Sequence, residues 1–157
     1  MKKIYWLKLL GSLILPQLFG FFGSLFTTPQ IPGWYQTLQK PIFNPPSWLF
    51  APVWTSLFLL MGVSVYFIWS EPKNSKRNIL LGLFIFQLFL NLFWSILFFG
   101  LQSPILALIE IIILWFAILI CVIGFWKINK ISSILLWPYL AWVSFASILN
   151  YYIFILN

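Results

Sequence analysis

Five runs of apolar residues, each long enough to cross a lipid bilayer, limit most strongly how this chain can fold. They cover approximately residues 4–26, 47–69, 78–99, 104–126 and 132–154. About 20 helical residues span a hydrocarbon core of roughly 30 Å. Because the core offers the backbone no water, each run must bond its own peptide groups as an α-helix. We therefore expect an all-α integral membrane protein in which residues 1–157 form a single transmembrane domain, a five-helix bundle with a long structured loop at about 27–46.

The composition excludes several classes of protein. The chain is 62% hydrophobic and 7% charged, which is too apolar for a water-soluble domain. It has no histidine and one cysteine, Cys121, so we expect no metal site, no internal disulfide and no histidine-based catalytic set. No cofactor should be required. The nine Lys and Arg residues are scattered, which argues against a nucleic-acid partner.

The basic residues gather on one side of the predicted helices. That side carries Lys2, Lys3, Lys8, Lys73, Lys76, Arg77, Lys127 and Lys130, whereas the other carries Lys40. Lys and Arg accumulate in cytoplasmic segments. The N-terminus is therefore predicted to be cytoplasmic and the C-terminus to lie on the opposite face, and we expect insertion into a bacterial cell membrane.

The loop at about 27–46 is rich in proline and aromatic residues. Its X-Pro steps end at Pro29, Pro32, Pro41, Pro45 and Pro46. Each step biases the preceding residue toward extended geometry. We therefore expect a stiff, non-helical cover, with Trp34, Tyr35 and Pro41 as lid residues. For Trp34 and Tyr35 a place in the interfacial aromatic belt is the alternative.

The start of the second helix should be set by its polar and proline residues. Asn44 is expected to cap it, with Pro45 and Pro46 in its first turn. Pro52 would then lie beyond that turn. We expect it to remove a backbone hydrogen bond and to kink the helix beside Trp54.

Three predicted helices carry polar or aromatic residues at spacings of three or four. The sets are Trp54 and Phe58; Gln87, Asn91 and Trp94; and Tyr139, Trp142, Ala146 and Asn150. Such spacing places each set on one helix face, and side-chain amides facing lipid would be costly, so these faces should turn inward. They either join the helices by packing and hydrogen bonds or border an apolar slot for a flat small molecule.

Glu110 is the only carboxyl group at membrane depth in the sequence. A charge near a helix centre costs roughly 2.5–3.5 kcal/mol there. We expect Glu110 to be protonated or bonded to another helix, and a proton-relay role is the alternative.

Three stretches resemble a known family. They are WYQTLQKPIFNPPSWLFAPVW at 34–54, QLFLNLFWSILFFG at 87–100 and PYLAWVSFASILNYY at 138–152. They are similar to the tryptophan-rich sensory protein / translocator protein family, also called TspO/MBR or the peripheral-type benzodiazepine receptor family. The resemblance implies a five-helix bundle, often a homodimer, whose pocket opens toward the first loop and binds porphyrins, sterols and synthetic isoquinoline carboxamides.

The resemblance also implies roles for particular residues. The positions that match the family's ligand pocket or its mouth are Phe50, Ala51, Trp54, Phe58, Asn91, Trp94, Trp142, Ala146 and Leu149. The implied function is a membrane receptor or sensor for porphyrins such as protoporphyrin IX or haem, or for other flat lipophilic molecules, contributing to tetrapyrrole regulation or transport. Some bacterial members are reported to degrade protoporphyrin IX in light. In that enzyme reading Trp54 and Trp142 would be the catalytic residues.

The sequence departs from the family's pattern at two places. The sterol-recognition element needs a basic residue after its tyrosine, but Tyr151 and Tyr152 are followed by IFILN. The glycine pair on the third helix of some relatives is reduced to Gly82 with Phe86 one turn later, which leaves the dimer face open. Relatives also occupy the mitochondrial outer membrane. A transporter is the third reading, although no inverted repeat is visible.

Overall fold

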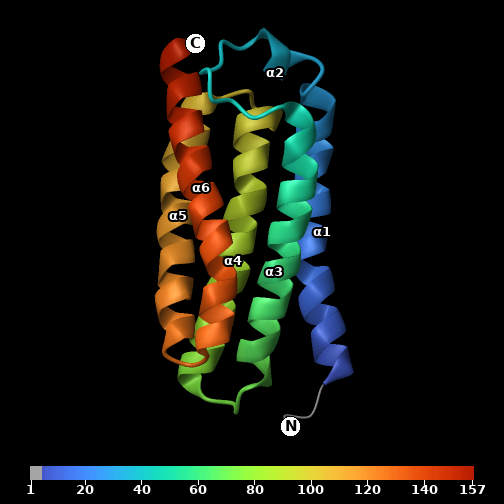
Figure 1. The fold of residues 1–157 in the computed structure, drawn as a ribbon, viewed down its shortest axis with the longest axis vertical. Helices are drawn as coiled ribbons and strands as arrows, with labels where there is room; N and C mark the ends of the chain where they lie inside the picture. The colour runs from blue at the N-terminus through green and yellow to red at the C-terminus, as the bar shows by residue number, and fades with distance from the viewer. Residues whose placement is uncertain (1–4) are drawn as a thin grey trace.

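The computed structural model describes residues 5–157 as a bundle of five long helices (Figure 1). These are α1 (Trp6–Gln30), α3 (Phe50–Ser70), α4 (Ser75–Ser95), α5 (Pro104–Trp126) and α6 (Lys130–Leu156). Three short elements join them: α2 (Trp34–Thr37), a 3-10 turn (Ser47–Leu49) and a π-helical turn (Ile96–Gly100). With the adjoining short turns included, the five spans are long and apolar enough to cross a membrane, which confirms the predicted fold class.

The long helices form a closed ring. α1 packs against α3 and α4, α6 packs against α3 and α5, and α5 packs against α4. The α3–α4 and α5–α6 connections lie at the same end as the N-terminus, whereas α2 and the C-terminus lie at the other end (Figure 1). Short polar connections explain the antiparallel neighbours, because Asn74, Ser103 and Asn129 each accept a hydrogen bond from the first turn of the following helix.

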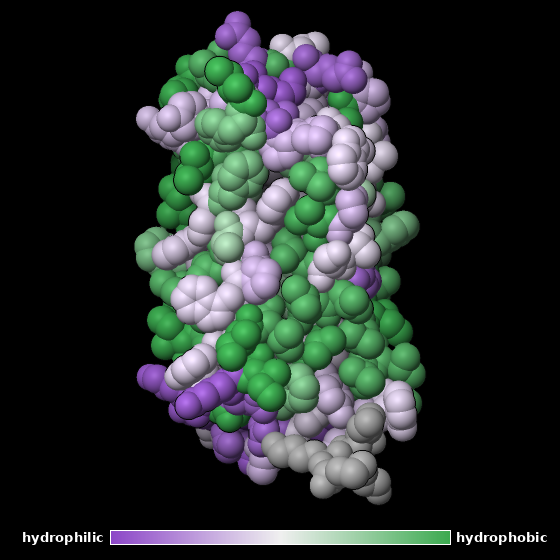
Figure 2. Space-filling view, in the orientation of Figure 1, coloured by the Kyte–Doolittle hydropathy of each residue, from purple (hydrophilic) through white to green (hydrophobic). Residues whose placement is uncertain are grey.

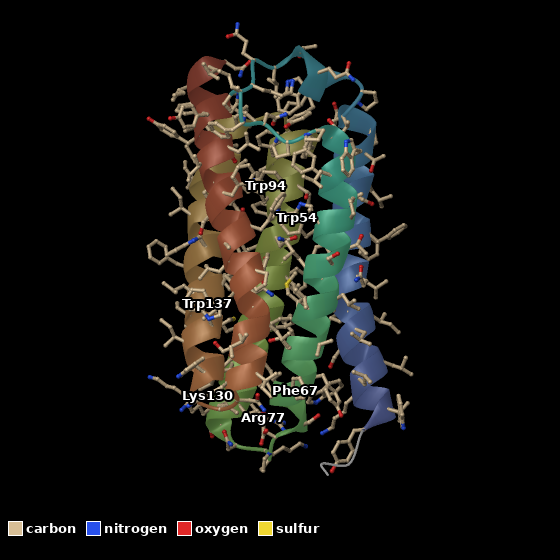
Figure 3. All side chains as sticks on the ribbon, viewed as in Figure 1. Trp54, Phe67, Arg77, Trp94, Lys130 and Trp137 are labelled. Carbon is tan, nitrogen blue, oxygen red and sulfur yellow. The ribbon has the colours of Figure 1, made fainter. Side chains whose placement is uncertain are left out.

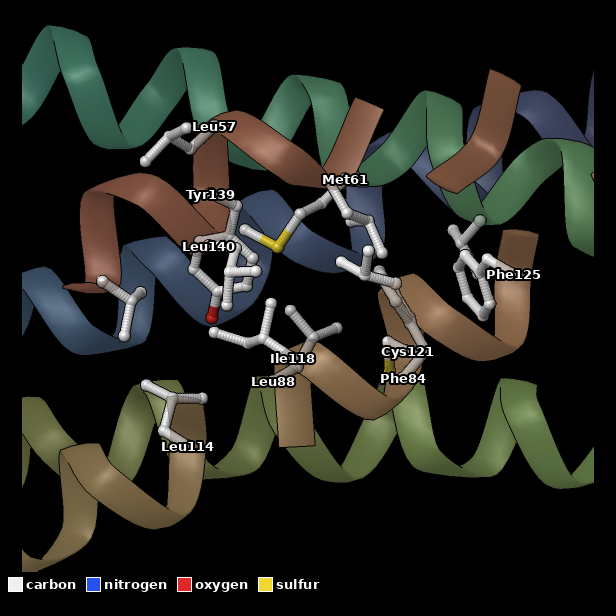
Figure 4. Packing of buried hydrophobic residues seen from close by; sticks show 14 of the residues in the cluster. Leu57, Met61, Phe84, Leu88, Leu114, Ile118, Cys121, Phe125, Tyr139 and Leu140 are labelled. Atoms are coloured by element: carbon white, nitrogen blue, oxygen red, sulfur yellow. The ribbon is translucent and has the colours of Figure 1, made fainter. Parts of the chain in front are cut away.

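Side chains fill the middle of the bundle and the half that holds the α3–α4 and α5–α6 connections. Met61, Phe84, Ile118 and Phe125 are all less than 2% exposed and belong to one apolar cluster (Figure 4). Gly62 lets α1 and α3 approach closely, since a Cβ there would lie 2.7 Å from the backbone oxygen of Ser12. This part of the molecule is a close-packed core.

The loop between the first two long helices is shorter than predicted and partly helical. α1 continues past residue 26 to Gln30, through Pro29, and residues 34–37 form α2. The prediction of a wholly non-helical loop at 27–46 was therefore wrong. Proline is tolerated inside membrane helices, and packing of α1 along α3 and the π-helical turn outweighs the local bias of the X-Pro step. Residues 1–4, and with them Lys2, Lys3 and the predicted helix start at 4, lie outside the described residues.

The start of α3 also corrects the sequence analysis. Asn44 does not cap this helix, because its Oδ1 accepts a hydrogen bond from the Tyr35 hydroxyl (2.8 Å). Pro46 precedes the 3-10 turn in extended geometry, outside the helix. Pro52 is the third residue of α3, and the 3-10 turn runs into this helix without a break. The predicted loss of a backbone hydrogen bond at Pro52, and the kink beside Trp54, stay predictions.

The other helix limits differ by a few residues. α4 begins at Ser75, before the predicted 78, and leads at its far end into the π-helical turn. α6 covers Lys130–Leu156, where 132–154 was predicted, and α5 has the predicted limits of 104–126.

Candidate functional site

A cavity of about 360 Å³ lies in the half of the bundle beneath α2. Its lining comes from α1, α3, α4, α6, the π-helical turn and the first loop, and within the described chain α5 contributes no lining residue. The volume falls in the range of roughly 300–1,000 Å³ that is usual for small-molecule pockets. The lining includes every position that matched the family's pocket: Phe50, Ala51, Trp54, Phe58, Asn91, Trp94, Trp142, Ala146 and Leu149. Their role in binding stays a prediction.

Trp54 and Phe58 form the α3 wall. Their rings stack with centroids 5.5 Å apart and planes at 29°. The edge of the Trp54 ring meets Tyr139 of α6, with 6.2 Å between centroids. The four-residue spacing therefore produces one aromatic surface that continues across to α6. Figure 3 shows Trp54 and Trp94 between the helices, whereas Trp137 of α6 is 52% exposed on the outer surface.

Trp94 forms a second wall with the π-helical turn. Its ring stacks on Phe98 at 5.0 Å and 19°. Its Nε1 donates to Asn150 Oδ1 (3.1 Å), and Asn150 Nδ2 donates to the Pro104 backbone oxygen (2.8 Å). These two bonds fix the indole between α4, α5 and α6. The π-helical turn widens the helix where Phe98 points inward, and such turns occur often at functional sites.

Trp142 forms the α6 wall. Its ring lies 5.5 Å from that of Phe145 and 6.5 Å from that of Phe50. Within residues 5–157 the indole N–H groups of Trp54 and Trp142 donate to no protein acceptor. Both side chains line the cavity. The two indoles therefore offer hydrogen-bond donors to a bound molecule.

A buried polar network lies beneath the cavity. Asn91 Nδ2 donates to the Tyr139 hydroxyl (3.0 Å), and this hydroxyl donates to Gln87 Oε1 (2.9 Å). Gln87 Nε2 approaches the sulfur of Met61 at 3.9 Å. Gln87 and Tyr139 join helices, as one interpretation of these inward faces expects, and Asn91 also lines the cavity. The interpretation of this cavity as a slot for a flat molecule stays a prediction.

Tyr35 closes the cavity on the loop side. Its side chain is 3% exposed and packs against Phe50, Phe98 and Phe99, with ring centroids 5.7–6.4 Å apart. Burial raises the pKa of its hydroxyl to about 12, against a smaller opposing effect of the hydrogen bond to Asn44. Tyr35 is therefore buried within the protein and is not an interfacial belt residue, and its role as a lid residue stays a prediction.

The other two predicted lid residues do not line the cavity. Trp34 packs from outside on Phe98, with centroids 5.5 Å apart, so it supports the lid. Pro41 lies further along the loop, away from the lining. The loop is held to the C-terminus by two hydrogen bonds: the Gln39 N–H donates to Asn157 Oδ1, and Asn157 Nδ2 donates to the Gln39 oxygen, each at 2.9 Å.

The sequence analysis missed the α1 wall of the cavity. Its lining residues include Gln17, Gly20, Gly23, Ser24 and Thr27. Small and hydroxyl residues at spacings of three and four along α1 were the available signal. A Cβ at Gly20 would clash with the Phe58 ring, so this glycine makes room for the aromatic wall.

Glu110 lies outside the cavity on α5. Its side chain is 5% exposed, and within the described residues neither carboxyl oxygen has a hydrogen-bond partner. The expected alternative of a bond to another helix was therefore wrong.

The fold and the cavity define a class: a five-helix membrane protein with an aromatic pocket between its helices. The sequence model of the TspO/MBR family matches residues 12–156, and the chain belongs to this family. It is 48% identical over 139 residues to the "Tryptophan-rich protein TspO" of Chlorobaculum tepidum, covering 88% of each chain. It is 43% identical over 151 residues to the protein of the same name from Archaeoglobus fulgidus (96% and 97% covered). It is 35% identical over 148 residues to the human "Translocator protein" (93% and 88% covered).

Proposed function

We propose that this protein is a membrane receptor or sensor that binds porphyrins, such as protoporphyrin IX or haem, and other flat lipophilic molecules in the aromatic cavity. Binding would contribute to tetrapyrrole regulation or transport. The observation that carries this proposal is the convergence of Trp54, Trp94 and Trp142, from three different helices, on one cavity that Tyr35 closes. Relatives named translocator and sensory protein are compatible with it.

The chemistry of the cavity suits such a ligand. Stacked rings at Trp54–Phe58 and Trp94–Phe98 offer broad apolar faces to a planar guest. An aromatic pair contributes about 0.5–1.5 kcal/mol beyond the buried area, so several rings would support micromolar binding. The free N–H groups of Trp54 and Trp142 could donate to polar substituents on the ligand edge.

Titration with protoporphyrin IX, followed by tryptophan fluorescence, tests the proposal. The wild-type protein in detergent should be quenched stoichiometrically. Trp54→Ala and Trp142→Ala should each weaken binding about tenfold, since each removes a ring from the cavity. Trp137→Ala is the matched control, because Trp137 is 52% exposed on the outer surface. Unchanged affinity in both cavity variants would overturn the proposal.

A second candidate function is light- and oxygen-dependent porphyrin degradation. It is favoured by one observation: Trp54 and Trp142, the two residues that this function would need, line the same cavity. Protoporphyrin absorbance under illumination should separate the candidates, with Trp54→Phe and Trp142→Phe compared. Variants that bind but no longer degrade the porphyrin would support an enzyme. If illuminated porphyrin disappears no faster with the wild-type protein than without protein, the enzyme function is excluded.

We further propose a homodimer in a bacterial cell membrane, with the N-terminus cytoplasmic. The orientation is supported by the described basic residues: Lys73, Lys76, Arg77, Lys127 and Lys130 lie in or beside the connections at one end of the bundle, whereas Lys40 lies in the loop at the other. Reporter fusions to each terminus test the orientation, and mass determination in detergent tests the dimer.

A further inference from the structure

A second concavity lies on the outer surface, between α4 and α5, at the end of the bundle that carries most basic residues. It is lined by Lys76, Ile79 and Leu80 of α4, by Ile120, Ile123 and Gly124 of α5, and by Lys127. Its volume is about 380 Å³. The aromatic cavity shares no residue with this groove. The groove is therefore a separate feature with its own chemistry.

The two lysines of the groove are not neutralised by the protein. Within residues 5–157 the ammonium groups of Lys76 and Lys127 form no hydrogen bond or ion pair. The sequence has only two carboxylates, Glu71 and Glu110. Glu71 accepts a hydrogen bond from Asn129, and Glu110 is buried in α5. The groove thus presents uncompensated positive charge at the level of the membrane surface.

The N-terminal end of α4 increases this positive character beside Lys76. Lys76 lies in the first turn of α4, which contains no acidic residue, although the N-terminal end of a helix favours negative charge. The neighbouring Arg77 is occupied elsewhere, because its Nη1 donates to the Glu71 backbone oxygen (2.8 Å). Lys76 and Lys127 are therefore the cations available to an external anion.

The apolar part of the groove extends away from the lysines into the membrane. Ile120 precedes Lys127 by two helical turns, about 10 Å along α5. Ile79, Ile120 and Ile123 are each at least 50% exposed. At Gly124 a Cβ would clash with the Leu80 side chain, so the glycine lets α4 and α5 approach closely along the groove. Figure 2 shows hydrophilic residues at the ends of the bundle and a hydrophobic band between them.

We propose that this groove binds one anionic glycerophospholipid, with its phosphate between Lys76 and Lys127 and an acyl chain along Ile79, Ile120 and Ile123. Basic pockets between membrane helices recognise anionic headgroups in this way. A lipid is favoured over a soluble anion because the lysines lie at the mouth of an apolar groove. A soluble anion would leave that groove in contact with the bilayer and would gain nothing from it.

Native mass spectrometry of the full-length, delipidated protein in detergent tests this proposal. The probe is an equimolar mixture of phosphatidylglycerol and phosphatidylcholine with identical acyl chains. Each lysine beside an anionic headgroup contributes about fivefold to binding, so one phosphatidylglycerol should be retained with about thirtyfold preference. Lys76→Gln combined with Lys127→Gln should remove this preference.

Lys73→Gln combined with Lys130→Gln is the matched control. It removes the same charge at the same end but leaves the groove intact, so the preference should persist. Ile120→Trp should fill the apolar part and reduce retention of both lipids. Circular dichroism and gel filtration verify folding. If the double variant fails to fold, each single lysine variant should still lose about fivefold.

Three results would overturn the proposal. One is equal retention of the two lipids by the wild type. Another is displacement of phosphatidylglycerol by millimolar glycerol 3-phosphate, which would show that the headgroup anion alone is recognised. An equal loss of preference in the control pair would assign the effect to general surface charge and would also contradict a groove site.

Discussion

The two halves of the bundle are built from similar apolar residues but differ in packing. Toward the N-terminal end, Phe84 stacks on Phe125 with centroids 6.2 Å apart, and both rings are fully buried among aliphatic side chains. Toward the loop end, Trp54 and Trp94 stack on rings of their own helix segment and leave about 360 Å³ between the walls. The comparison shows that aromatic residues stacked within one helix segment can border an open space, whereas rings that stack between two helices fill it.

The largest effect is expected from truncation in the filled half. Phe84→Ala should destabilise the protein by about 3–5 kcal/mol, because it leaves a cavity in a close-packed region. Trp142 borders the cavity, so its side chain is not fully packed. Trp142→Ala should therefore lower the unfolding temperature less than Phe84→Ala does, and it should weaken porphyrin binding more. Thermal unfolding in detergent and porphyrin titration measure the two effects. Equal stability losses would contradict the distinction between the halves.

The polar network between the halves should give the next largest effect. Tyr139→Phe leaves the Asn91 and Gln87 amides without the hydroxyl that each bonds, at a cost of about 1–3 kcal/mol. Because Asn91 also lines the cavity, porphyrin affinity should fall as well. Tyr66→Phe removes a hydroxyl that accepts a hydrogen bond at the exposed helix start, and it serves as the control. If Tyr139→Phe is as stable as the wild type and binds porphyrin with the same affinity, the network contributes neither to stability nor to binding.

The lid should respond to alkaline pH through Tyr35. Its hydroxyl has a pKa of about 12 in the fold, above the ordinary value of 10.0, so the folded protein disfavours the ionised form. The stabilisation from the neutral hydroxyl is complete below about pH 10 and is lost as the pH rises to about 12. Thermal unfolding between pH 9 and 12 should therefore fall more steeply for the wild type than for Tyr35→Phe. Parallel curves would exclude this role.

Two glycines offer a smaller but closely matched comparison. Gly20→Ala places a Cβ against the Phe58 ring, so it should push the aromatic wall into the cavity and cost about 1–3 kcal/mol. Gly82→Ala meets nothing within 4 Å and should stabilise α4 by at most about 1 kcal/mol. Unfolding temperature and porphyrin affinity should both fall in the first variant alone. If the two variants have the same unfolding temperature and porphyrin affinity, the Phe58 ring can move aside without cost.

The smallest effect is expected at Glu110. Its buried carboxyl group has no hydrogen-bond partner within the described chain. Replacing it with leucine removes an unsatisfied polar group at similar volume, so Glu110→Leu should leave stability unchanged or raise it by about 1 kcal/mol. Thermal unfolding measures this change. A marked loss of stability would show that the carboxyl group has a partner in the membrane.

Local chemistry determined several features of this protein directly from the sequence. The five spans follow from apolar length alone, because every bilayer-crossing segment must satisfy its own backbone. The inward direction of Asn91, Trp94 and Trp142 follows from helical spacing and the cost of amides in lipid. For these reasons the fold class and the inward faces of these helices could be predicted without coordinates. Phe50, Ala51 and Leu149 came from the family resemblance alone, and the α1 wall of the cavity was missed.

Contacts between distant segments decided the rest. The continuation of α1 through Pro29 depends on packing against other helices, which outweighs a local preference for extended geometry. Asn44 accepts a hydrogen bond from Tyr35 instead of capping α3. Gly20 lines the cavity, and its lack of a side chain leaves room for the Phe58 ring of another helix. Whether the space between the rings stays open depends on ångström-scale separations between helices, and those separations are set by tertiary packing and are not encoded in any one segment.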